Sequence, residues 1–194
     1  MTKLASVLKD VRACTLCAQH FKHDPRPVVR ISSTARVLII GQAPGTKVHA
    51  SGVPWDDRSG DRLREWLGVD RDTFYDEARI AIMPMGFCFP GQDKKGGDLP
   101  PRPECAPLWH PRLLPLMPQV DLTILIGQYA QARYLGEARK ATLTDTVKAW
   151  KNFRSKFLPL PHPSWRNTGW LKLNPWFEKE LLPVLRRQVK KLLA

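Results

Sequence analysis

Short apolar runs alternate along this chain with segments whose apolar residues recur at helical spacing. The runs predict strands at residues 36–41, 79–84 and 121–127, and a fourth within 154–161. The helical segments are residues 4–11, 59–67, 128–135 and 174–193. Ser59 is the expected N-cap of the second helix and Gly68 its stop, while Pro183 is expected to kink or divide the last helix.

Strands that alternate with helices predict an α/β fold with a parallel or mostly parallel sheet. We expect a three-layer sandwich, in which helices flank a central, mostly parallel sheet of four strands. Residues 1–194 are predicted to form a single domain, with residues 1–30 as an N-terminal arm. Ligands of such sheets bind beyond the carboxyl ends of the strands. Residues 41–45 and 162–167 follow two of the strands, so a site between them is the first geometric hypothesis.

The chain has four cysteines, in two well-separated pairs. Cys14 and Cys17 form a C-x-x-C motif, and Cys88 and Cys105 lie far downstream, around a long loop rich in Gly, Pro and Lys. A loop of this length is expected to have a function or to anchor a metal. Four thiolates suit zinc or a [4Fe–4S] cluster, and spacing alone does not separate the two, although zinc ribbons prefer two close pairs. The alternative is four unrelated buried thiols.

The composition is that of a soluble globular protein, with 43% hydrophobic and 25% charged residues. No apolar run is long enough for a transmembrane helix, and the N-terminus lacks the apolar core of a signal peptide. We therefore expect no membrane association and a cytoplasmic location, where thiols stay reduced and bind metal or do redox work. A net charge of +13 favours a polyanionic partner such as nucleic acid; the alternative is a basic protein that is merely soluble.

Several short motifs follow the first and the last predicted strand. Gly41-Gln-Ala-Pro-Gly45 comes after the first strand, and Gly52-Val-Pro-Trp55 and Asp57-Arg-Ser-Gly-Asp61 come next. His162-Pro-Ser164 and Asn167-Thr168 follow the last strand. With the four cysteines, these motifs resemble the uracil-DNA glycosylase superfamily over nearly the whole chain, and most of all its iron–sulfur branches, families 4 and 5. The resemblance implies excision of uracil, or of a related deaminated base, from DNA by hydrolysis of the N-glycosidic bond after base flipping, in base excision repair.

The resemblance also implies catalytic roles. His162 is the candidate donor to uracil O2, where negative charge develops; the alternative is a loop histidine bonded to backbone. Asp57 is the best candidate for assisting the water, because the first motif has no carboxylate and Gln42 can orient water without acting as a base. The competing acids are Asp56 and Asp61. Asn167 is a second polar candidate for orienting the water or the base.

Other residues are candidates for holding the substrate. Trp55 would stack on the flipped base, unless it is a core tryptophan. Gly41, Ala43 and Gly45 would let base or phosphate approach the backbone closely. The candidate phosphate contacts are Ser164, Arg166, Lys94 and Lys95. The alternative for Ser164 is that it only caps the following turn. The candidate wedges into the duplex are Trp165 and Trp170.

The four cysteines, Cys14, Cys17, Cys88 and Cys105, match the family's cluster ligands, so the resemblance favours a structural [4Fe–4S] cluster that ties down the arm, with zinc as the alternative. One departure from the family pattern concerns Pro84. Related enzymes commonly carry there, four residues before the third cysteine, an Asn that reads uracil, and proline has no donor. We expect a monomeric glycosylase. The alternatives are a binding module for damaged or abasic DNA and, third, an iron–sulfur redox protein.

Overall fold

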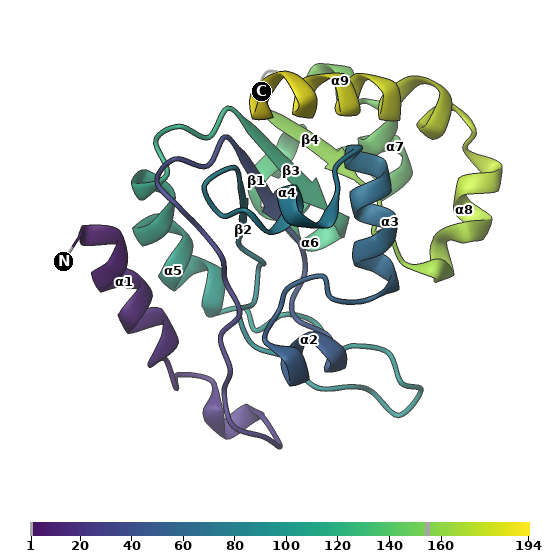
Figure 1. The fold of residues 1–194 in the computed structure, drawn as a ribbon. Helices are drawn as coiled ribbons and strands as arrows, with labels where there is room; N and C mark the ends of the chain where they lie inside the picture. Colours follow the sequence, from purple (N-terminus) through teal and green to yellow (C-terminus); the bar gives the residue numbers. More distant parts are fainter. Residues whose placement is uncertain (1, 154–155) are drawn as a thin grey trace.

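A central sheet of parallel strands organises the part of the chain that the computed structural model describes, residues 2–153 and 156–194 (Figure 1). Its strands, in the spatial order β2-β1-β3-β4, are β1 (Val37–Ile40), β2 (Ile80–Ile82), β3 (Leu122–Ile126) and β4 (Phe157–Leu160). The register aligns Ile39 of β1 with Ile82 on one side and with Ile124 on the other. The predicted four-stranded parallel sheet is therefore confirmed; of the range predicted for its last strand, residues 154 and 155 lie outside the described residues.

Helices cover both faces of the sheet, which confirms the three-layer sandwich (Figure 1). One face is covered by α1 (Lys3–Arg12), α5 (Cys105–Leu113) and α6 (Gly127–Leu135). The other is covered by α3 (Arg58–Leu67), α4 (Arg71–Tyr75), α7 (Leu143–Lys148) and α9 (Leu182–Leu193). Leu38 of β1 belongs to the first core and Ile39 to the second, because successive side chains of a strand point to opposite faces. Burial on both faces explains why the strands read as continuous apolar runs.

The helix ends depart from the sequence predictions in two places. Asp57, not Ser59, is the N-cap of α3, because its Oδ1 accepts a hydrogen bond from the backbone N–H of Gly60 at 2.9 Å. Gly68 ends the helix in the left-handed conformation, as predicted. The last predicted helix begins as a π-helical segment, Phe177–Leu181, and Pro183 lies in the first turn of α9, so the proline does divide it.

The smaller elements complete the chain. They are α2 (Thr46–Ser51), α8 (Thr168–Leu173) and the 3-10 turns Ala18–His20, Leu114–Leu116, Gly136–Ala138, Trp150–Asn152 and Trp165–Asn167. The N-terminal arm reaches the β2 edge of the sheet, where Arg30 and Ile82 form an isolated antiparallel bridge and the Val28 N–H donates to the Phe87 carbonyl at 2.7 Å. None of the helices in the described part of the chain is both long and apolar enough to cross a membrane.

Candidate active site

A cleft of about 600 Å³ lies beyond the carboxyl ends of the strands, where a parallel sheet is expected to bind its ligand. Residue 41 follows the end of β1 directly, and residue 162 follows β4 by two positions. Ten of the residues predicted to act on or hold the substrate line this cleft: Gly41, Gln42, Ala43, Gly45, Trp55, Asp57, His162, Ser164, Arg166 and Asn167. The two motifs, which are more than a hundred residues apart in sequence, therefore form one site.

His162 is held in a defined tautomer. Its Nδ1 lies 3.2 Å from the backbone nitrogen of Ser164, and because that N–H can only donate, Nδ1 is the acceptor. The neutral ring then carries its proton on Nε2, and no hydrogen bond within the described residues uses that donor, so it is free to meet a ligand of the cleft that His162 lines. Burial lowers the pKa of His162 and the nearby charge of Asp57 opposes this shift, so the ring is neutral at physiological pH.

Trp55 lies on the floor of the cleft in a strained backbone conformation. Its φ is 58°, a value that bulky residues rarely adopt. Gly60 makes this conformation possible, since a Cβ at that position would stand 1.7 Å from the Trp55 carbonyl oxygen. The indole ring packs on Gly41, where a Cβ would stand 2.8 Å from Cζ2, and its centroid is 5.5 Å from that of His162. Trp55 thus touches the core and also presents an aromatic surface to the cleft.

Asp57 lines the same cleft as His162 and carries a carboxylate into it. One of its oxygens caps α3, and the positive end of that helix stabilises the negative charge. The two competing acids, by contrast, form ion pairs away from the cleft. Asp56 pairs with Arg71 at 2.8 Å and Asp61 with Arg64 at 2.5 Å. The capped carboxylate keeps a second oxygen that can accept a hydrogen bond from a water molecule.

Several polar side chains of the cleft hold its backbone in place. The Gln42 amide donates to the Leu99 carbonyl at 3.3 Å and so ties the first motif to the long loop. The Asn167 amide donates to the His162 carbonyl at 2.7 Å. The Ser164 hydroxyl accepts from the Arg166 N–H at 3.2 Å, which caps the following turn, as the alternative reading of Ser164 proposed. These contacts position His162 and restrict what Gln42 and Asn167 can offer a substrate.

The rim of the cleft carries an exposed aromatic and a cation. Trp165 is 67% exposed, and the Arg166 guanidinium lies 5.7 Å from the centre of its ring. Trp170, the other predicted wedge, instead donates from Nε1 to Thr144 at 2.8 Å and packs on the core. The predicted phosphate contacts Lys94 and Lys95 are exposed in the long loop and do not line the cleft. Trp165 and Arg166 are thus the rim residues placed to meet a large ligand.

The wall at Pro84 is held by a buried histidine that the sequence analysis missed. His110 of α5 donates from Nε2 to the Pro84 carbonyl at 3.0 Å, and its Nδ1 accepts from the Tyr134 hydroxyl at 2.5 Å. His110 is fully buried, and burial lowers its pKa to about 4 although the bond to Pro84 opposes the shift. The neutral ring therefore fixes the wall without adding a charge.

A family model described as Uracil DNA glycosylase superfamily matches residues 29–186, which include both motifs and all four strands. The chain belongs to the uracil DNA glycosylase superfamily. Membership makes the protein a DNA glycosylase in general terms, with DNA as its partner. The cleft between the two motifs is therefore the candidate active site, and Cys14 and Cys17 lie N-terminal to the matched region.

The cleft contains a second acid that no motif identified. Asp98 lines the cleft from the loop between Cys88 and Cys105, and a Cβ at Gly45 would stand 3.1 Å from its Oδ2. The loop pairs Gln92 with Asp98 in an isolated antiparallel bridge. The length of the loop was the one signal in the sequence that could have drawn attention to it.

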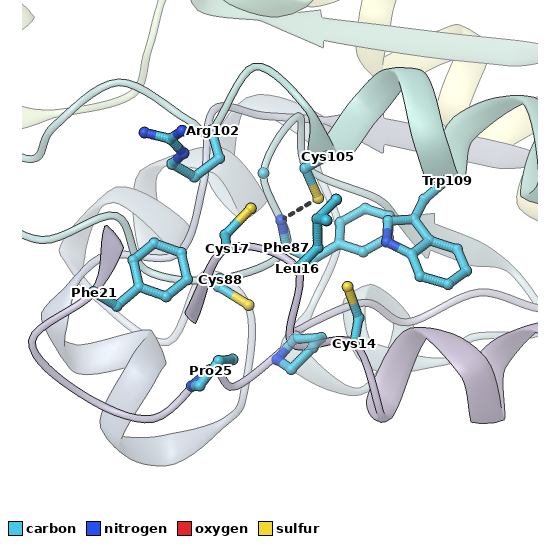
Figure 2. A pocket seen from close by; sticks show the side chains of 12 residues that line it. Cys14, Leu16, Cys17, Phe21, Pro25, Phe87, Cys88, Arg102, Cys105 and Trp109 are labelled. Atoms are coloured by element: carbon cyan, nitrogen blue, oxygen red, sulfur yellow. Dashed lines mark hydrogen bonds between the residues drawn. The ribbon is translucent and has the colours of Figure 1, made fainter. Parts of the chain in front are cut away.

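The four cysteines of the glycosylase line one small apolar cavity (Figure 2). Cys14 and Cys17 follow α1, Cys88 follows β2, and Cys105 is the first residue of α5. Burial raises the pKa of Cys88 to about 11 and that of Cys105 to about 12, so a metal bound there would have to displace both protons. The Cys105 sulfur accepts a hydrogen bond from the Phe87 N–H at 3.3 Å. This all-sulfur donor set, joined from three parts of the chain, fits a cluster.

Proposed function

We propose that this enzyme excises uracil, or a closely related deaminated base, from DNA by hydrolysing the N-glycosidic bond. The single observation that carries the proposal is the neutral His162, which has its Nδ1 occupied and lines a cleft together with Trp55 and Asp57. An extruded base would stack on Trp55, and its carbonyl oxygen would accept a hydrogen bond from His162.

The chemistry follows from how charge develops as the bond breaks. The leaving pyrimidine becomes anionic, and a neutral N–H donor stabilises that anion without having to give up its proton. The sugar becomes cation-like, and the Asp57 carboxylate, which lines the same cleft as His162, would stabilise it and orient water toward C1′. The charge on Asp57 also acts on His162, which supports a common reaction centre.

We further propose that Cys14, Cys17, Cys88 and Cys105 hold a [4Fe–4S] cluster with a structural role. No group of three or more His, Cys, Asp and Glu side chains within the described ranges is close enough to hold a single metal ion, whereas all four thiols surround one cavity. The resemblance to the iron–sulfur branches of the family favours the cluster, and zinc is the alternative that the same four thiols could bind. Assay of iron, acid-labile sulfide and zinc in the purified protein tests this proposal, and one zinc per chain without sulfide would refute it.

Release of free uracil from a labelled oligonucleotide tests the glycosylase proposal. We expect release by the wild-type enzyme and at least a 100-fold lower single-turnover rate for both His162→Ala and Asp57→Asn, since loss of one such donor or acid costs about 10²–10³-fold. His20→Ala is the matched control, because His20 is exposed on the N-terminal arm and does not line the cleft. Absence of uracil release from single-stranded and duplex DNA by the metal-loaded protein would contradict the proposal.

One observation favours a second candidate, a binding module for damaged or abasic DNA. Pro84 stands where the resemblance expects a uracil-reading Asn, and its carbonyl is already occupied by His110. A protein of this kind would bind an abasic duplex tightly and release no base. The same oligonucleotides, used in an affinity measurement beside the excision assay, separate the two candidates.

A further inference from the structure

The segment of the cleft wall at Pro84, with the two residues that follow it, offers a base no free N–H donor. Pro84 has none, and its carbonyl accepts from His110. The N–H groups of residues 85 and 86 donate to the carbonyls of Gly41 and Gln42, at 2.9 Å each. Because a polar base edge must find partners when it leaves water, another group of the cleft has to meet it, such as a side chain with a free polar atom.

Asp98 is the side chain best placed to do so. Gln92 donates to its Oδ1 at 3.3 Å, while Oδ2 faces the backbone of Gly45 at the edge of the first motif. Within residues 2–153 and 156–194, no hydrogen bond or ion pair occupies Oδ2. The absence of a side chain at Gly45 leaves this oxygen open to the cleft, and the Gln42–Leu99 contact holds the loop that carries it.

We propose that Asp98 reads the polar edge of the extruded base, which Pro84 cannot do; this inference rests on the proposed function. The matching ligand is a base whose edge presents a ring N–H beside a carbonyl, as in uracil and hypoxanthine. The carboxylate accepts the N–H, and a protonated carboxyl would also donate to the carbonyl. Burial raises the pKa of Asp98, as do the charges of Asp57 and Asp93, whereas Gln92 and Arg166 lower it.

Two substitutions of Asp98 test whether its hydrogen bonds to the base matter. Asp98→Asn keeps an acceptor and adds a donor, the same pattern as the neutral carboxyl, whereas Asp98→Ala removes both. Asp93→Asn is the charge-matched control, because Asp93 belongs to the same loop and its Oδ1 accepts from two backbone N–H groups, which an Asn oxygen can also do. The substrates are duplexes with one uracil or one hypoxanthine, and a duplex with a tetrahydrofuran abasic site is the binding probe without a base.

For Asp98→Ala we expect kcat/KM to fall roughly 10-fold or more on both bases, the effect of a lost base contact. Asp98→Asn should stay within a few-fold of the wild type, Asp93→Asn should match it, and all variants should bind the abasic duplex equally. Wild-type excision by Asp98→Ala, an Asn variant as poor as Ala, or equally weakened abasic binding would each overturn the inference. If the wild-type enzyme releases no base, the proposed function fails. The inference about Asp98 is then tested by binding alone: loss of the preference for a uracil duplex over the abasic one in Asp98→Ala supports it, and an unchanged preference overturns it.

Discussion

Replacement of Gly41 by alanine tests whether the position of the Trp55 ring sets the activity of this glycosylase. The new Cβ would stand 2.8 Å from Cζ2 of the indole. Because carbon atoms pack at about 3.5–4.0 Å, the ring has to retreat by roughly 0.7 Å or more. Gly41 does not have a positive φ, so alanine fits its backbone, and the nearest atoms that the new Cβ meets beyond its chain neighbours all belong to the Trp55 ring.

The expected result is a fall in activity that exceeds the fall in stability. A misplacement of about 1 Å at a reacting centre costs up to about 100-fold, so we expect single-turnover excision to slow by roughly 10- to 100-fold. Overpacking of this kind costs about 1–3 kcal/mol of the free energy of unfolding. Urea unfolding measures the second quantity and fixes conditions under which the variant stays folded during the excision assay.

A second substitution identifies the cause. Trp55→Phe keeps a stacking surface and removes the ring that contains Cζ2, so Gly41→Ala should cost little in the Trp55→Phe background. Gly169→Ala is the glycine control, because a Cβ there meets nothing within 4 Å. If Gly41→Ala slows excision as much in the Trp55→Phe background as in the wild-type enzyme, the ring contact is not what sets the rate and the stacking argument fails.

Two further predictions concern a buried and an exposed ring. The pKa of His110 is lowered from 6.5 to about 4, so its contribution to stability is complete above pH 6.5 and is lost as the pH falls toward 4, by about 3 kcal/mol in total. Urea unfolding across this pH range measures the loss, and His110→Gln should make the free energy of unfolding depend less on pH. An unchanged pH dependence in the variant would contradict the assignment. Trp165→Ala should leave stability within about 0.5 kcal/mol, because the side chain is 67% exposed, and should slow excision from duplex more than from single-stranded DNA, since only a duplex must be unstacked. Equal losses on the two substrates would exclude a wedge.

The strands and the location of the site were readable from the sequence because both depend on local patterns. A run such as 121–127, apolar without alternation, has few structures open to it other than a strand buried on both faces. The parallel order then brings the ends of β1 and β4 to the same edge of the sheet, and with them the two motifs. The polar positions that come together in the cleft follow from this topology.

The remaining features depend on tertiary contacts that leave no periodic signal. Ser59 and Asp57 are both good N-caps by residue type, and the choice of Asp57 follows from the entry of the chain through the strained Trp55. In the sequence His110 is an ordinary polar residue of a helix, and its contact with the Pro84 carbonyl depends on how α5 packs. Asp98 lies in an irregular loop, where neither period nor motif indicates which side chain will face the active site.

That loop connects the cysteines to the chemistry. Residues 89–104 run between two of the thiols, and their middle forms a wall of the cleft through the Gln42–Leu99 and Gly45–Asp98 contacts, beside α2 (Figure 1). Holding so long a segment in one conformation costs conformational entropy, which few buried contacts within the loop offset. A group bound by Cys88 and Cys105 would fix both ends of the segment and lower that cost. In this proposal the cysteines act on base recognition at a distance, by restricting the loop that carries Asp98.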